Sequence, residues 1–148
     1  MDYQAETIRH VLDELAYWGR ALRRRGPDDW WAKVRPFSRD NTEAWELAHN
    51  GVAYRPADWL DRPLTEAERQ AFSRGVKELE RVGVIVAVAS PSGRVSHLRP
   101  TARGLAVGLR LCPEADRAAI RKALTTTKWA TKEHLRAIDA TEEAGADE

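Results

Sequence analysis

Few side chains in this sequence have the type and spacing that catalysis or metal binding requires. The four histidines are widely spaced and lack paired ligands; they are His10, His49, His97 and His134. Glu46 and His49 form a Glu-x-x-His pair, but a di-iron site needs a second copy of that pair, and the chain has none. No phosphate-binding glycine loop or zinc-ligand spacing occurs. We therefore expect packing or surface histidines, no metal, no cofactor and no enzymatic activity.

The most informative pattern is a stripe of polar and basic side chains between residues 66 and 82. At about 100° per residue, one helix face carries Gln70, Arg74, Lys77 and Arg81. The opposite face carries Phe72, Val76 and Leu79. The segment contains four acidic and four basic residues, so its net charge is zero. Only the distribution of these residues around the helix distinguishes a basic face. Such a stripe is either a solvated helix face or a surface that contacts a partner.

Local signals define the helix that carries this stripe. Thr65 and Glu68 have the spacing of a capping box, which places the helix start near Glu66. Gly83 suits the left-handed position that ends a helix. The sequence therefore predicts a helix over about residues 66–82.

A β-hairpin and a short helix are expected directly after this helix. Residues 84–89 (VIVAVA) are apolar and mostly β-branched, residues 90–93 (SPSG) indicate a turn, and residues 94–99 predict a second strand. Thr101 can cap a helix that ends near Leu111. Residues 84–112 contain four arginines and no acidic residue, so the hairpin region is locally basic.

The order helix, glycine, strand, turn, strand and capped helix resembles the winged-helix domains of MarR- and PadR-like transcription regulators. SRGVKELERVGVI is similar to the end of their recognition helix, and HLRPTARGLAVG is similar to the strand and helix after their wing. PADWLDRPLTEAE resembles their first helix-turn-helix element, although Pro63 occupies a turn where glycine is more usual. The resemblance covers about residues 56–112. It implies a mainly α fold with a small β-hairpin wing (α+β), extended by N- and C-terminal helices.

This resemblance implies binding of double-stranded DNA in the regulation of transcription. A recognition helix would enter the major groove, and a wing would contact the backbone or minor groove. The candidates for contacts to or near base edges are Gln70, Ser73, Arg74 and Lys77, because arginine can make two hydrogen bonds to guanine and glutamine two to adenine. The candidates for phosphate or wing contacts are Arg81, Ser92, Arg94, Ser96 and His97.

A non-catalytic protein-interaction module is the alternative function. Winged-helix folds also serve as docking modules, so the fold does not settle the function. The formal net charge of +1 is lower than many nucleic-acid-binding proteins have, and six tryptophans are many for 148 residues.

Further helices are expected on both sides of the core, within a single domain over residues 1–138. Apolar residues at three- and four-residue spacing predict a helix over residues 4–25, and further helices are expected at 42–49 and within 113–138. Pro113 suits the first turn of the helix that follows it, and the three threonines at 125–127 predict a kink or break. Arg23, Arg24 and Arg25 either favour the C-terminus of the first helix through its dipole or form a phosphate-contacting patch. The tryptophans of segment 27–64 are expected to pack in the core. Residues 139–148 hold five acids and no base, which predicts a disordered acidic tail.

The chain is expected to form a homodimer and to reside in the cytoplasm. The apolar stripes within residues 8–22 and 129–138 exceed what a small winged core needs to cover itself. No apolar run reaches 18 residues, and the N-terminus lacks the pattern of a signal peptide. The single cysteine, Cys112, excludes an internal disulfide framework; it is either a buried inert thiol or an oxidation sensor. No small-molecule effector can be named from the sequence.

Overall fold

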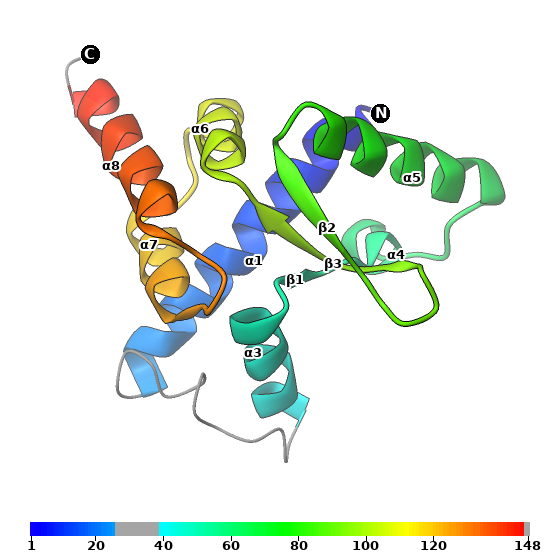
Figure 1. Ribbon diagram of the computed structural model, residues 1–148, viewed down its shortest axis with the longest axis horizontal. Helices are drawn as coiled ribbons and strands as arrows, with labels where there is room; N and C mark the ends of the chain where they lie inside the picture. The colour runs from blue at the N-terminus through cyan, green and yellow to red at the C-terminus, as the bar shows by residue number, and fades with distance from the viewer. Residues whose placement is uncertain (26–38, 147–148) are drawn as a thin grey trace.

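The chain folds around its long N-terminal helix, which the other elements surround (Figure 1). The computed structural model describes residues 1–25 and 39–146, with side chains for residues 1–21 and 42–141. The elements are, in order, α1 Tyr3–Arg25, α3 Arg39–His49, β1 Val52–Ala53, α4 Pro56–Leu60, α5 Glu66–Arg81, β2 Ile85–Ala89, β3 Val95–Pro100, α6 Ala102–Leu111, α7 Arg117–Thr126 and α8 Lys132–Ala146. The described part is thus mainly helical with a small sheet, as the α+β class predicts.

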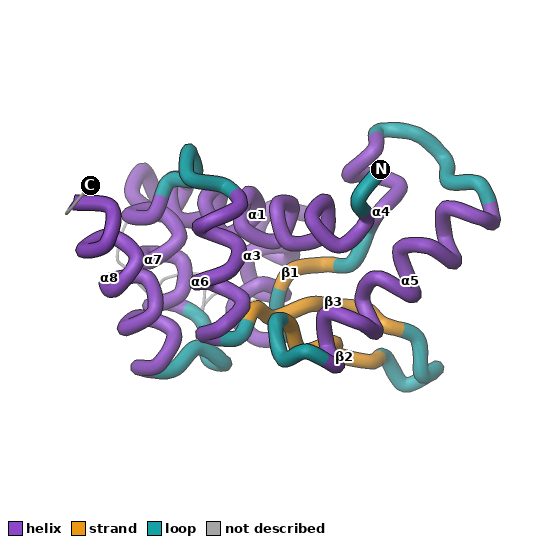
Figure 2. The backbone as a smooth tube through the Cα atoms, turned by 90° about the horizontal axis from the view of Figure 1, so that it is seen from above, coloured by secondary structure: helices purple, strands orange, loops and turns teal. Residues whose placement is uncertain are grey.

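The apolar stripe of α1 forms the centre of the core. Its buried residues are Ile8, Val11, Leu12, Leu15 and Trp18, as the helical spacing predicts. The helix packs against α7 most extensively and also against α5 and α6. Figure 2 shows α6, α7 and α8 towards one end of α1, and α4, α5 and the sheet towards the other.

The sheet is three-stranded and antiparallel, in the order β1-β3-β2. Leu98 in the central strand pairs with Val52 on one side and Ala87 on the other. The expected hairpin is confirmed, because β2 and β3 pair directly and the turn between them has Gly93 at a φ of 84°. A bulge at Val88 and Ala89 interrupts the register.

The boundaries of α5 agree with the local signals. The capping box between Thr65 and Glu68 forms, and Gly83 adopts a φ of 77° just after the helix. Phe72, Val76 and Leu79 are buried, which confirms the predicted inner face.

Three predicted boundaries in the flanking regions are wrong. The helix expected at 42–49 begins at Arg39. Pro113 does not start a helix; α7 begins at Arg117, because the Asp116 side chain accepts a hydrogen bond from the Ala119 N–H and caps that later start. The acidic tail is not disordered throughout, since α8 continues to Ala146.

The extension of α8 has a tertiary cause. Ile138 is fully buried, and the Asp139 carboxylate accepts a hydrogen bond from Arg121 Nε of α7 at 2.9 Å. These contacts hold the helix just where the acidic segment begins. The expected break at residues 125–127 is confirmed, because α7 ends at Thr126.

The tryptophans outside the first helix have different roles. Trp59 packs against the core and stacks on His10 with 5.2 Å between ring centroids, whereas Trp45 stacks on its neighbour His49 at 4.2 Å. Trp129 Nε1 donates to the Leu47 carbonyl oxygen at 2.9 Å and thus ties the α7–α8 connection to α3. Trp30 and Trp31 lie outside the described residues.

The structure removes the reason given for a dimer. The stripe of α1 is covered by α7, α5 and α6 of the same chain, and Ile138 has no exposed surface. A second copy is not needed to cover these faces, so homodimerisation stays a prediction without that support. Among the described helices, none is long and apolar enough to cross a membrane.

Close backbone packing predicts opposite effects for two helical glycines. A Cβ at Gly104 of α6 would lie 1.9 Å from the Val84 carbonyl oxygen, whereas a Cβ at Gly75 of α5 would meet nothing closer than 3.5 Å. We expect Gly104→Ala to lower the free energy of unfolding by about 2 kcal/mol or more, because overpacking forces the backbone to shift. Gly75→Ala should be neutral or stabilise by up to about 1 kcal/mol through helix propensity. Urea denaturation measures both, and equal effects would contradict the packing described here.

Candidate nucleic-acid interface

A groove of about 1090 Å³ lies between α4, α5 and the β2–β3 hairpin. We call it the α5–hairpin groove. It gathers four of the predicted site residues: Gln70, Ser73 and Lys77 from α5, and Arg94 from the hairpin. All four are exposed. Residues from two separate elements therefore face one space that is open to solvent.

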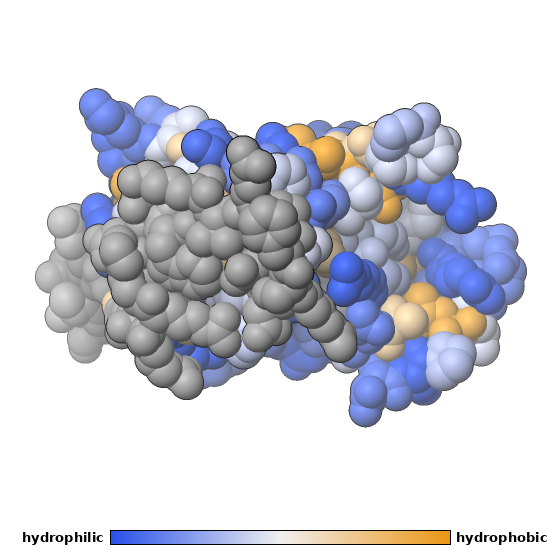
Figure 3. Space-filling view, turned by 90° about the horizontal axis from the view of Figure 1, so that it is seen from below, coloured by the Kyte–Doolittle hydropathy of each residue, from blue (hydrophilic) through white to orange (hydrophobic). Residues whose placement is uncertain are grey.

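The groove has mixed walls. Its basic residues are Arg55, Arg69, Lys77 and Arg94, and its acidic residues are Asp58, Glu66 and Glu80. Apolar side chains, among them Leu64 and Val95, complete the lining. Figure 3 shows a small apolar area among polar residues at the end of the molecule that carries α4, α5 and the hairpin.

Two of the acids already have partners within the chain. Glu66 lies 3.4 Å from Arg69 Nε and accepts from Gln70 Nε2 at 3.3 Å. Glu80 accepts from the backbone N–H of Ala87 at 3.1 Å. These contacts leave Arg55, Lys77 and Arg94 as cations of the groove without an acidic partner within ion-pair distance in the described part of the chain.

The start of α5 is fixed by a network of charge-assisted hydrogen bonds. Glu68 accepts from the guanidinium of Arg62 at 2.8 Å and from the backbone N–H of Thr65 at 3.0 Å. These hydrogen bonds lower the pKa of Glu68 to about 2. The turn that precedes them has Asp61 in the left-handed region, with a φ of 54°. The chain thus makes the tight turn at Asp61, two residues before Pro63.

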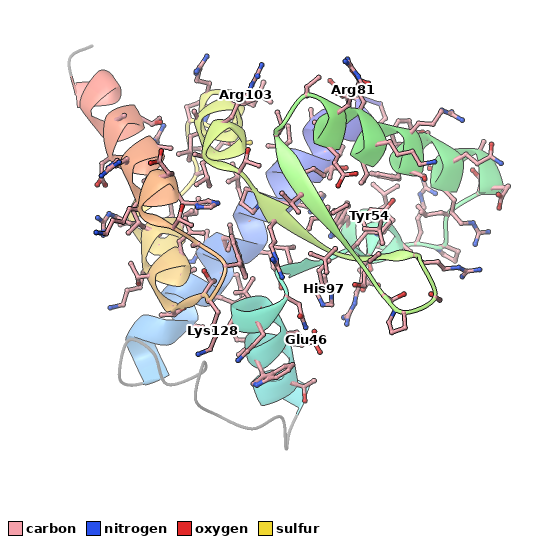
Figure 4. All side chains as sticks on the ribbon, in the orientation of Figure 1. Glu46, Tyr54, Arg81, His97, Arg103 and Lys128 are labelled. Carbon is pink, nitrogen blue, oxygen red and sulfur yellow. The ribbon has the colours of Figure 1, made fainter. Side chains whose placement is uncertain are left out.

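Three other predicted residues lie on the same elements but do not line the groove. Arg74 is exposed on α5, on the turn between Gln70 and Lys77. Arg81 Nε donates to Glu78 at 2.9 Å, and Figure 4 places it at the end of α5 away from the hairpin tip. Ser92 lies at that tip, with its Oγ 2.7 Å from Ser90 Oγ.

Ser96 and His97 lie in a different place from the other candidates. The bulge leaves Ser96 between the pairs Val88–His97 and Ala89–Val95, and the Ser96 and His97 side chains contact each other, with Oγ 2.9 Å from Nδ1. Both line a second pocket of about 650 Å³ between α1, α3 and β1. His97 Nε2 is 2.9 Å from the Glu46 carboxylate (Figure 4). Ser96 and His97 were expected on the same surface as the other candidates, but they do not line the α5–hairpin groove.

The face of α5 that borders the groove is rotated relative to the predicted stripe. Residues 66, 70, 73, 77 and 80 line the groove, at the same three- and four-residue spacing as the stripe. This face shares Gln70 and Lys77 with the stripe and excludes Arg74 and Arg81. The sequence analysis did not identify Arg55, Arg69 or Glu80 as groove residues. Arg55 lies before α4, outside the periodic segment. Arg69 and Glu80 lie on α5, but the helical period does not tell which face of α5 turns towards the hairpin.

Neither His49 nor Cys112 lines the α5–hairpin groove. His49 Nδ1 contacts the Trp45 carbonyl oxygen at 2.9 Å. Cys112 is buried, and burial raises the pKa of its thiol, which disfavours the reactive thiolate. Within residues 1–21 and 42–141, no three His, Cys, Asp or Glu side chains are grouped to hold a metal. The arginines at 23–25 lie outside the described side chains.

Comparison with known proteins adds no assignment: no family model, no curated protein and no solved structure matches the chain.

The pocket around His97 gives a prediction for its titration. Burial lowers the pKa of His97 from 6.5, and it outweighs the nearby Glu46 carboxylate, which raises the pKa. Nuclear magnetic resonance should find a pKa below 6.5 in the native chain and a still lower value in Glu46→Gln. An unchanged or higher pKa in that variant would contradict the contact between the two side chains.

The same shift sets the direction of a stability effect. Because the folded pKa is below the unfolded one, the unfolded state binds the proton more readily. The contribution of neutral His97 to the free energy of unfolding is therefore complete above pH 6.5. It is lost as the pH falls through the folded pKa of His97.

Proposed function

We propose that the chain binds double-stranded DNA and regulates transcription, with α5 as the recognition helix and the β2–β3 hairpin as a wing. The observation that carries this proposal is the α5–hairpin groove, in which Lys77 and Arg94 come from the two elements that a winged helix presents to DNA. α5 and the hairpin follow one another in the chain, and the fold of the hairpin beside α5 brings Lys77 and Arg94 to one space.

The order of the elements supports the winged-helix assignment. A helix, a short strand, a second helix and a third helix precede a hairpin, and the first strand joins the sheet beside β3 to give the order β1-β3-β2. The short α4 and the longer α5 are connected by a turn of five residues. This arrangement presents the exposed side of α5 next to the hairpin, as the proposed docking on DNA requires.

The roles of the side chains follow from their places. Gln70, Ser73 and Arg74 are exposed on the first and middle turns of α5 and can reach base edges. Lys77 was expected near base edges, but its place in the groove with Arg94 suits a phosphate contact for both side chains. Ser92 at the hairpin tip can donate to a phosphate, and Arg81 remains a candidate at the far end of α5. Two copies would read two half-sites.

Docking of a protein partner is the second candidate, and the composition of the groove favours it. Asp58, Glu66 and Glu80 oppose a phosphate backbone, and the apolar part of the lining would suit a peptide side chain. A protein partner would bind with little dependence on salt, whereas a duplex would release counterions on binding.

Substitution of the two groove cations tests the DNA proposal. Lys77→Ala and Arg94→Ala should each weaken binding to all duplex sequences alike and reduce the salt slope by about one unit, because each removes one phosphate contact. Titration of a fluorescent random duplex at several salt concentrations measures both quantities.

Two exposed cations outside the groove serve as matched controls. Lys132 lies at the start of α8, and Figure 4 shows Arg103 on α6, away from the hairpin tip. Lys132→Ala and Arg103→Ala should leave the salt slope unchanged. Equal effects from all four substitutions would indicate binding through net charge alone, and no binding at low salt would reject the proposal.

The homodimer is tested separately. Light scattering at high micromolar concentration should give twice the mass of 16.7 kDa if two copies pair. A monomeric mass would remove the two-half-site arrangement and leave a single binding element.

A further inference from the structure

Glu80 makes an unusual contact between α5 and the edge of the sheet. β2 is an edge strand, because the order is β1-β3-β2, and its outward backbone groups have no neighbouring strand. The Ala87 N–H points outward from this edge and donates to Glu80 Oε2 at 3.1 Å. Both residues line the α5–hairpin groove. An anionic group of the chain therefore sits on a backbone donor inside the proposed DNA-binding surface.

Lys77 and Arg94 line the same groove as this carboxylate. Lys77 precedes Glu80 by three residues and thus lies on the same face of α5, and Arg94 faces the groove from the hairpin. Neither cation is within ion-pair distance of Glu80 among the described contacts. Outward N–H groups at a sheet edge, together with positive side chains, favour the binding of an anion.

We propose that the Glu80 carboxylate occupies the place of a DNA phosphate in the free protein, and that a phosphate of the bound duplex displaces it from the Ala87 N–H. This inference rests on the proposed DNA binding and adds an internal competitor to it. The phosphate would accept from the N–H and be neutralised by Lys77 and Arg94, while the Glu80 side chain turns to solvent. Glu80 is exposed, and within the described part of the chain its carboxylate accepts only this hydrogen bond, so its release does not disturb the core.

Glu66 provides a matched comparison within the same groove. It carries the same charge on the same helix, but it contacts the side chains of Arg69 and Gln70 and no backbone donor of the sheet. Replacing either glutamate removes one negative charge from the groove, so a general electrostatic gain in affinity should appear at both positions. Only the change at Glu80 can free the Ala87 N–H.

Four variants separate the effect of the negative charge on duplex affinity from the effect of competition for the Ala87 N–H. Glu80→Gln removes the charge but keeps an oxygen that can accept from Ala87, whereas Glu80→Ala removes the acceptor as well. Glu66→Gln and Glu66→Ala repeat the two steps at the control position. Duplex affinity is measured for the native chain and all four variants at one fixed salt concentration, with thermal unfolding followed by circular dichroism to verify that each variant is folded.

The expected result is an additional gain at one position only. Glu80→Ala should bind duplex about two- to tenfold more tightly than Glu80→Gln, the range that one net hydrogen bond contributes. Glu66→Ala and Glu66→Gln should bind alike. Duplex binding with the same ratio of affinities, alanine variant to glutamine variant, at both glutamate positions would rule out the proposed competition between Glu80 and the phosphate. The DNA proposal would then stand. If neither the native chain nor any variant binds duplex, both are wrong.

Hydrogen exchange of the Ala87 amide tests the contact without DNA. The exchange should be faster in Glu80→Ala than in Glu80→Gln or the native chain, because the donor is then exposed to water. An Ala87 amide that exchanges at the same rate in all three proteins would show that the carboxylate does not hold this N–H, and would overturn the inference.

Discussion

The buried face of α1 is the interaction on which the rest of the structure depends. Its apolar residues contact α5, α6 and α7, so one helix supplies a common core to elements that are distant in the sequence. Close packing with α7 requires a glycine, because a Cβ at Gly19 would lie 1.8 Å from the Ala119 carbonyl oxygen. A Cβ at Gly108 of α6 would likewise lie 2.8 Å from Ile8. Backbone contact therefore sets the spacing of α1 and α7, whereas side chains of α1 packed on Gly108 set the spacing of α1 and α6.

This core determines how α5 is presented. Tyr3 of α1 packs edge-on against Phe72 with 4.8 Å between ring centroids, and Gly75 lies beside Gln4. The face of α5 with Phe72 and Gly75 packs against α1, so the opposite face is exposed to solvent. The face with Ser73 and Lys77 borders the hairpin. The hydrogen bonds of Arg62 and Glu68 fix the start of the helix. Contacts with α1 and the hydrogen bonds at the helix start thus set the orientation of α5 beside the hairpin.

The electrostatics of the groove explain why a nearly neutral chain can still be proposed to bind DNA. The acids on α5 are engaged within the chain: Glu66 with Arg69, Glu78 with Arg81, and Glu80 with the β2 backbone. Such exposed contacts contribute little to stability, but they decide which cations are left to face a partner. In the groove these are Arg55, Lys77 and Arg94. Net charge alone does not describe this distribution.

Local chemistry allowed the sequence to determine the elements and their ends, whereas the relations between elements were decided by tertiary packing. The capping box at Thr65, the glycine at position 83 and the turn before Arg94 act over a few residues, and all three were predicted from the sequence. The pattern also identified the buried faces of α1 and α5. The pattern could not give the rotation of α5 relative to the hairpin. A helical period applies to every face of a helix and does not indicate which face lies next to which other element. For the same reason the contacts of His97 with Glu46 and of Glu80 with Ala87, and the support that Arg121 gives to the acidic end of α8, appear only when the chain is folded.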